Sequence, residues 1–312
     1  MNTIAAWITL AVYVSFGFRA IRDKFSEILL RLGDWVIALL LLPYLLAVEF
    51  RPSGGDFLRM VLFLILPTLL LRLRSSRAKS FDFLQVLSIL AIWIPVETDL
   101  FLLFIDQIFP NFNLSTTLTA FYLLPEVNAR LVTGVELPLQ TLIALLLALY
   151  LFLIRHPLNR IGFSFRFNFE DLKIALIGLA GFVIVGLPVG LGIGFISFNP
   201  EIPTLVDLIF GLLGGYLLTA LMEEVLFRGI IQNLLTMRVS NNLVILGASS
   251  IIFGIAHLNN TTPGYPIPNW GYVLMATLAG LAYGWVWQRT GKVTVSAITH
   301  MLVNLLWGLV FS

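Results

Sequence analysis

The chain is divided into long apolar runs, and these runs decide the solvent in which it can fold. Residues 174–198 carry no charged side chain. This run is long enough to cross a bilayer as a helix, for which about 20 apolar residues suffice. The 312 residues are 59% hydrophobic and 12% charged, against roughly 25% charged in an average soluble domain. We therefore expect an all-α fold, a polytopic helical bundle embedded in a membrane.

Hydropathy and length predict about ten transmembrane helices, with eight as the lower bound. The first apolar run, Ile4 to Phe18, precedes the first basic residues instead of following them, so we interpret it as a retained span and not as a cleaved signal. The expected spans are 3–18, 35–50, 57–72, 83–105, 137–154, 174–198, 204–224, 243–258, 271–288 and 293–311.

The charges of the connecting loops predict an orientation, because Lys and Arg accumulate in short cytoplasmic loops. With ten spans and the N-terminus outside, the outer loops hold little more than Arg51, Arg59 and Arg130. The inner loops then hold the basic residues Arg19, Arg22, Lys24, Arg31, Arg72, Arg74, Arg77, Lys79, Arg155, Arg160, Arg166, Lys173, Arg238, Arg289 and Lys292. We expect an integral membrane protein, in a plasma (cytoplasmic) membrane, with both termini outside.

Composition also excludes several classes of function. A net charge of +2 is too small to indicate nucleic-acid binding. The chain has no cysteine, which excludes a thiolate nucleophile and a Cys-ligated metal. No internal repeat is evident, so an inverted-repeat transporter gains no support.

Glycine is concentrated in the second half, where 18 of the 24 lie in residues 173–312. Several are four residues apart, a spacing that lets membrane helices approach closely, and we expect tight packing there. The first half offers one polar group near membrane depth, Glu97 with Asp99, which we interpret as the interfacial end of a span. The glycines at this spacing are Gly186, Gly190 and Gly194, Gly211 and Gly215, and Gly280 and Gly284.

Two adjacent carboxylates, Glu223 and Glu224, follow an uncharged stretch from Leu208 to Met222. Charges at membrane depth cost several kcal/mol and usually line a functional cavity. Glu224 and Arg228 are four residues apart, the better orientation for an ion pair within a helix. We therefore expect Glu224 to neutralise Arg228 and Glu223 to stay free for other work.

Three more polar residues lie in apolar runs: His257, His300 and Asn304. His300 and Asn304 share one face of the last helix, where an interhelical hydrogen bond is the structural alternative. His257 alone could also be an interfacial residue at a helix end. A hairpin turning near Ser240 brings Glu223 and His257 to one level, roughly 22 Å from the turn. The third histidine, His156, lies in a basic loop and is interpreted as a surface residue.

These residues form three ordered motifs that resemble the CPBP family of intramembrane proteases, which includes type II CAAX prenyl proteases and bacteriocin-processing and self-immunity proteins. The motifs are Glu-Glu-x-x-x-Arg from Glu223, Phe-x-x-x-His from Phe253 to His257, and His-x-x-x-Asn from His300 to Asn304. The resemblance covers residues 205–309. It predicts a protease core over 171–312, after an N-terminal transmembrane region, 1–170, without an assigned family.

By this resemblance the protein is a glutamate-type endopeptidase that needs no cofactor. Glu223 is then the general base, His257 shares the attacking water, and His300 with Asn304 holds the oxyanion. Glu224, Arg228 and Phe253 support these four residues. In an alternative mechanism, Glu223, His257 and His300 bind zinc, since two histidines and one carboxylate form a known catalytic zinc set, although the His-Glu-x-x-His spacing is absent.

The expected substrate is a peptide or a membrane-anchored protein, with or without an attached lipid, in contact with the bilayer. We expect the mouth of the site on the basic, cytoplasmic side. The alternative class is a non-catalytic binding or immunity protein that keeps the polar core, and a proton-coupled transporter is the third. Glu223→Gln separates the first two, because it should harm folding in a structural core but only cleavage in an enzyme.

Overall fold

The structure, a computed structural model, describes residues 2–73, 82–97, 100, 102, 124–132 and 135–311. Asp99, most of the predicted span beyond Glu97, most of the expected loop 106–136 and the basic residues Arg74, Arg77 and Lys79 lie outside the described residues. The chain forms two compact units, Met1–Leu158 and Asn159–Ser312. We refer to them as unit 1 and unit 2.

Unit 1 consists mainly of apolar helices whose core is leucine-rich. Its buried side chains include Leu64, Leu71 and most of residues 142–152. The helices are α1 (Asn2–Ser15), α2 (Arg19–Leu32), α3 (Val36–Ala47), α4 (Gly54–Arg72), α5 (Phe83–Val96) and α8 (Leu139–Leu149), with a 3₁₀ turn at Gly33–Trp35 and a π-helical extension of α8 at Tyr150–Arg155.

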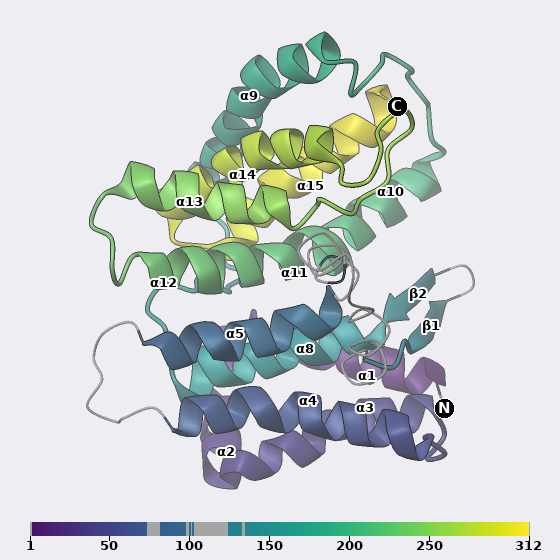
Figure 1. The fold of residues 1–312 in the computed structure, drawn as a ribbon, viewed down its shortest axis with the longest axis vertical. Helices are drawn as coiled ribbons and strands as arrows, with labels where there is room; N and C mark the ends of the chain where they lie inside the picture. The colour runs from purple at the N-terminus through teal and green to yellow at the C-terminus, as the bar shows by residue number, and fades with distance from the viewer. Residues whose placement is uncertain are drawn as a thin grey trace, which may run out of the picture. The chain divides into compact units, whose positions relative to one another are not determined.

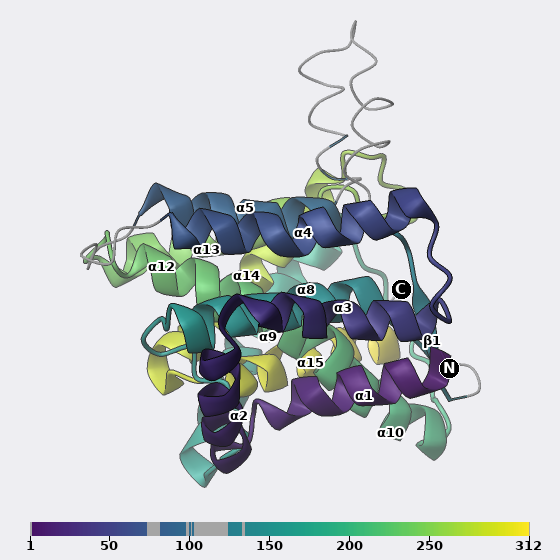
Figure 2. The ribbon, with the colours of Figure 1, turned by 90° about the horizontal axis from the view of Figure 1, so that it is seen from below.

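Two elements of unit 1 differ from the sequence prediction. The basic segment expected as a loop is helix α2, which has no buried residue and runs steeply across the direction of α1 and α3 (Figure 2). Such a charged, amphipathic helix is typical of a membrane interface. In addition, β1 (Asn128–Val132) and β2 (Val135–Pro138) pair antiparallel, with Ala129 opposite Leu137, at the end of the expected polar loop.

Unit 2 contains one long, continuous helical run, α10 to α12, and four further helices. The run begins at Leu205 and ends at Leu235. Figure 1 shows the turn between α12 and α13 at one end of unit 2 and the start of α10 at the other. The other helices are α9 (Phe169–Gly192), α13 (Asn242–Ile255), α14 (Trp270–Thr290) and α15 (Val293–Val310).

The lengths of these helices confirm the predicted all-α membrane bundle. Among the described residues, five helical segments are long and apolar enough to cross a membrane, and four shorter ones are also apolar. The five are Arg19–Ala47, Gly54–Arg72, Phe169–Gly192, Leu205–Leu235 and Val293–Val310, and the shorter ones are Asn2–Ser15, Phe83–Val96, Leu139–Arg155 and Asn242–Ile255.

Glycine allows close helix contacts in unit 2 at some of the predicted positions but not at all of them. A Cβ on Gly284 would lie 2.7 Å from Leu246 of α13, and one on Gly254 would lie 2.6 Å from the Val273 carbonyl of α14. By contrast, Cβ atoms at Gly211 and Gly215 would meet nothing within 4 Å. The prediction of tight packing is therefore wrong for α10.

Candidate active site

The helix that carries Glu223 and Glu224 is irregular on both sides of the pair. A π-helical segment, η3 (Gly215–Ala220), precedes four α-helical residues, Leu221–Glu224, and a second π-helical segment, η4 (Val225–Gln232), follows them. The short helix α12 (Asn233–Leu235) completes the run. Wider π winding is rare and often lies at functional sites. Here it sets the directions in which the two carboxylates project.

Glu224 points into the interior and is fully buried, as is Arg228. Its Oε1 lies 3.2 Å from the Arg228 guanidinium and accepts a hydrogen bond of 3.0 Å from Nδ1 of His300. Oε2 lies 2.5 Å from the Ser296 hydroxyl. The guanidinium approaches Glu224 as an ionic contact, without hydrogen-bond alignment at that nitrogen, and donates instead to the Gly280 carbonyl at 3.2 Å. The predicted ion pair is therefore present, and the same carboxylate holds α15 through His300 and Ser296.

Glu223 points the other way, toward two histidines. Its Oε2 lies 3.9 Å from Nε2 of His257 and 3.8 Å from Nε2 of His300. This oxygen is buried and has no hydrogen-bond partner among the described residues, although the side chain as a whole is 31% exposed. The contact brings three elements together: the Glu helix, the end of α13 and the middle of α15.

The two imidazoles are fixed on their far sides. Nδ1 of His257 lies 2.8 Å from the Phe253 carbonyl; because a carbonyl only accepts, this nitrogen carries a proton. The ring stacks on Tyr272, with centroids 5.3 Å apart. His300 stacks on Tyr283 at 4.3 Å. Each Nε2 is therefore directed at Glu223 by a partner on the other ring nitrogen.

Phe253 lies under this cluster and contacts the buried cation. The Arg228 guanidinium lies 4.3 Å from the centroid of the Phe253 ring, a geometry that stabilises a desolvated cation. The same ring meets Phe227 edge-on at 4.9 Å. Phe253 thus contacts both the Arg228 guanidinium and the Phe227 ring.

Asn304 lies one helical turn from His300 on α15, but it is exposed and faces a different space. It lines a groove of about 250 Å³ together with Gly211 of α10 and Gly215 of η3, among other residues. Within the described residues, no contact joins its amide to Glu223 or His257. The structure thus brings three of the four predicted catalytic residues together and places the fourth at the adjoining groove.

Comparison with known proteins identifies the segment that contains all these residues. Residues 205–306 match the sequence model of the type II CAAX prenyl endopeptidase Rce1-like family. Residues 205–306 form an Rce1-like domain. No curated protein and no solved structure shows a significant match to the chain. The Rce1-like domain begins at α10 and ends within α15. It therefore contains the three motifs, the Glu224–Arg228 pair and the contact of Glu223 with the two histidines.

Sequence analysis missed four polar or aromatic residues of the Rce1-like domain. Ser296 and Gln232 continue the four-residue spacing of their neighbours, and this spacing could have revealed them. Ser296 precedes His300 by four residues, and Gln232, which is buried and donates to the Gly284 carbonyl at 3.2 Å, follows Arg228 by four. Tyr272 and Tyr283 are aromatic residues within an aromatic-rich helix, and no spacing distinguishes them.

The proposed zinc ligands can be compared with the geometry that zinc requires. Bonds of about 2.0–2.1 Å to a tetrahedral ion place ligand atoms roughly 3.4 Å apart. Oε2 of Glu223 lies 3.8 and 3.9 Å from the two Nε2 atoms, wider than that spacing. Among the residues that the structure describes, no group of three His, Cys, Asp or Glu side chains is arranged to hold a metal ion. The carboxylate oxygen thus lies farther from the two imidazole nitrogens than ligand atoms of a tetrahedral zinc ion lie from each other.

Proposed function

We propose that unit 2 is an intramembrane endopeptidase that hydrolyses a peptide bond with a water activated by Glu223 and His257. The observation that carries this proposal is the position of Glu223 Oε2, a buried acceptor without a hydrogen-bond partner that faces Nε2 of both His257 and His300. The Rce1-like match supports a peptidase as the general class.

Glu223 acts as the general base in this proposal. The carboxylate removes a proton from water, the resulting hydroxide bonds to the carbonyl carbon of the peptide, and the C–N bond of the tetrahedral intermediate then breaks. The proton passes to the leaving amine, so that acid and base duties are completed by one site. Partial exposure of Glu223 gives the base access to water and substrate.

His257 shares the attacking water. Its Nδ1 proton is held by the Phe253 carbonyl, so in the neutral ring Nε2 carries a lone pair and accepts a hydrogen bond. A water between Nε2 and the Glu223 carboxylate would therefore direct one proton to each. This arrangement leaves an oxygen lone pair for the carbonyl carbon of the substrate.

His300 and Asn304 stabilise the oxyanion. Because Nδ1 of His300 bonds to the Glu224 carboxylate, Nε2 can donate a second hydrogen bond only if the His300–Glu224 pair holds one extra proton. With that proton on His300, both ring nitrogens donate: Nδ1 to the Glu224 carboxylate and Nε2 to the oxyanion. The Asn304 amide supplies a second donor when the substrate lies in the adjoining groove. Preorganised donors of this kind are worth about 10²–10³ in rate.

The substrate class follows from the position of the site. A base at membrane depth acts on a peptide that is anchored in or passes through the bilayer, and a prenylated CAAX tail, which gives the matched family its name, is one member of that class. Comparing the termini of membrane proteins in cells that carry the wild-type chain or Glu223→Gln tests the proposal.

We expect at least one terminus to be lost in cells with Glu223→Gln and to persist in cells with Glu170→Gln, a control whose side chain is 67% exposed at the start of α9. If the termini are identical in all three strains while the protein is present at equal abundance, the proposed endopeptidase is wrong. Equal abundance matters, because a structural role for Glu223 would instead lower the amount of folded protein.

A further inference from the structure

The groove beside Asn304 separates α10 from the C-terminal half of α15. Asp207 and Gly211 line it from α10, and Met301 and Gly308 line it from α15. No residue of α10 is buried, and the helix makes only sparse contact with α15 along this length. Asn304 also lines the groove, and it lies one turn from His300 on the same face of α15, so the groove adjoins the site at Asn304.

The glycines of this groove leave room that a helix contact would have filled. Cβ atoms added at Gly211, Gly215 or Gly308 would meet nothing within 4 Å. On α14, by contrast, Cβ atoms added at Gly280 or Gly284 would touch side chains of neighbouring residues. The glycines on α10 and at the end of α15 thus widen a groove, whereas those on α14 allow helices to touch.

In the opposite direction, toward the basic loops, the side chains beyond the Glu pair are packed in the interior. Between the Glu pair and the turn after α12, the side chains of Arg228 and Gln232 are buried. Ser296 of α15 is also buried, beside Glu224. The loop side is also fastened, because Lys292 at the start of α15 forms a 2.6 Å ion pair with Asp171 of α9. Among the described residues of unit 2, this packing favours entry at the groove over entry at the predicted mouth on the basic side.

The two ends of unit 2 carry opposite charges. Every Lys and Arg of unit 2 other than buried Arg228 lies at the end formed by residues 159–173, 236–242 and 289–292. The groove end carries Glu201 and Asp207 and no basic residue. Its rim is held by backbone hydrogen bonds from Asn199 and Glu201 to the last turn of α15. By the positive-inside rule the groove end faces away from the cytoplasm.

We propose that the groove between α10 and α15 admits the substrate as a peptide from the membrane face opposite the basic loops, with a Lys or Arg of the substrate paired to Asp207. This inference rests on the proposed function. It adds a side of access, a route and a charge preference. An apolar stretch of the peptide lies over Gly211 and Gly215, and the scissile bond reaches Asn304 and His300.

The absence of cysteine from the chain allows a direct test of the route by thiol labelling. Single variants Gly211→Cys and Gly308→Cys place a thiol in the groove without a steric conflict. Ser240→Cys marks the basic face, and Thr261→Cys marks the opposite one. Intact vesicles of defined orientation are treated from one side with a membrane-impermeant methanethiosulfonate that carries a trimethylammonium group.

We expect the groove thiols to react from the side that labels Thr261→Cys and not from the side that labels Ser240→Cys. Reaction from the Ser240 side, or no reaction from either side because lipid fills the groove, overturns the proposal. Neither result depends on proteolysis, so this experiment is decisive even if the proposed enzyme activity fails.

The charge preference is tested by a second reagent that carries a sulfonate. After each rate is divided by the rate of that reagent with free cysteine, we expect Gly211→Cys to react about fivefold faster with the cation, as one nearby carboxylate in a wet groove predicts. Adding Asp207→Asn should bring the ratio close to one. An equal ratio with Asp207 present contradicts the pairing with a basic substrate residue.

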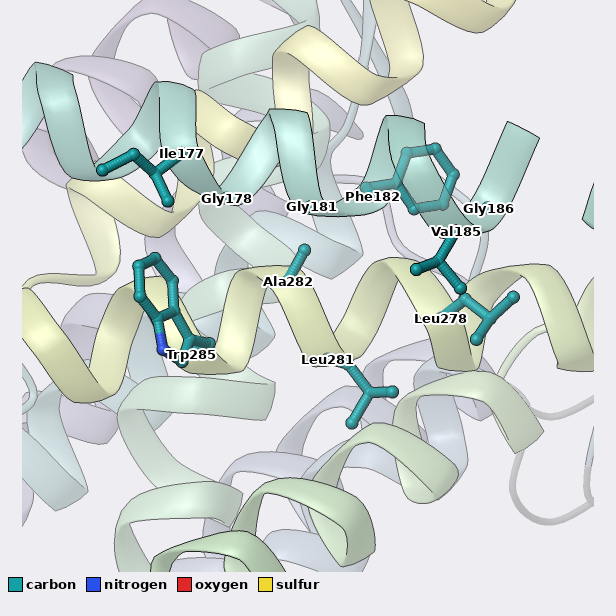
Figure 3. Close-up of a pocket in the computed structure, with 10 residues that line it drawn as sticks. All are labelled: Ile177, Gly178, Gly181, Phe182, Val185, Gly186, Leu278, Leu281, Ala282 and Trp285. Carbon is teal, nitrogen blue, oxygen red and sulfur yellow. The ribbon is translucent and has the colours of Figure 1, made fainter. Parts of the chain in front are cut away.

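A second groove of unit 2 supplies the control for substrate access. It lies between α9 and α14, where Gly181 and Phe182 face Leu278 and Trp285 (Figure 3). A Cβ on Gly181 also meets nothing within 4 Å. We expect Gly211→Trp to reduce cleavage at least tenfold at unchanged abundance and Gly181→Trp to leave it unchanged. Equal cleavage by both variants would contradict substrate entry through the groove between α10 and α15. A wild-type protein that cleaves no peptide would instead contradict the proposed endopeptidase activity.

Discussion

Glu224 accepts a hydrogen bond of 3.0 Å from Nδ1 of His300, and both side chains are buried. Glu224, which the sequence predicts to pair with Arg228, therefore contacts both Arg228 and His300. One contact neutralises a cation, and the other fixes an imidazole of the site. Stability and catalysis consequently meet at Glu224.

Glu224→Gln should destabilise the folded protein by about 3–5 kcal/mol, because it leaves the Arg228 guanidinium buried without its carboxylate. Unfolding in detergent micelles measures the change. The double variant Glu224→Gln with Arg228→Met removes the stranded charge and should recover part of the loss. If the double variant is less stable than Glu224→Gln, the ion pair does not explain the effect.

Glu223→Gln should change the free energy of unfolding by less than about 1 kcal/mol, since the side chain is partly exposed and makes no hydrogen bond at Oε2. The same change should lower cleavage at least a hundredfold, the usual contribution of a general base. Unfolding and cleavage are measured on one preparation. A large loss of stability would indicate a structural carboxylate instead.

Tyr272→Leu should lower kcat severalfold, because the Tyr272 ring stacks on His257 with an interplanar angle of 17° and helps to hold Nε2 toward Glu223. Tyr272→Phe keeps the ring and should keep the rate. Steady-state kinetics of both variants separate ring packing from the hydroxyl. If Phe is as slow as Leu, the hydroxyl and not the stacked ring acts on the site.

Gly254→Ala should destabilise unit 2 by about 1–3 kcal/mol, as overpacking does in tight cores, because the new Cβ would lie 2.0 Å from Thr277 Oγ1 and 2.6 Å from the Val273 carbonyl. Gly247→Ala on the same helix has open space and should be neutral or stabilising by up to ~1 kcal/mol. Unfolding of the two variants in parallel is the measurement, and equal stabilities would exclude a close α13–α14 contact.

Removal of metal should leave activity intact, because the separations of Glu223 from the two histidines exceed those of zinc ligands. Purified protein is dialysed against a chelator, assayed, and analysed for zinc. Zinc bound in equimolar amount and lost in proportion to activity would favour the alternative mechanism. Restoration of activity by added zinc would strengthen that result.

Patterns of charge and hydrophobicity predicted much of unit 2. The turn near Ser240 and the ion pair of Glu224 with Arg228 are both present. These features depend on local spacing along a helix. Glu223 and His257 also meet, because two antiparallel helices of known rise share one turn.

Other features depend on tertiary contacts and could not be read from spacing. Glycines at four-residue intervals predict close packing wherever they occur, but Gly211 and Gly215 face open space while Gly284 faces Leu246; only the neighbouring helix decides between the two. Stacking of Tyr272 on His257 joins different helices in the same way. In unit 1, helix α2 was missed because its charges were interpreted as a loop.

The π-helical segments on both sides of the Glu pair make this helix sensitive to its length. One residue of an α-helix turns the chain by about 100°, and a π segment accommodates residues that a regular helix would not. Deletion of a single residue from Gly215–Ala220 would relax that segment to α-helix and swing Glu223 away from both histidines while the helix itself survived. A chain of this kind can therefore lose its reaction by an in-frame deletion that leaves every named motif intact.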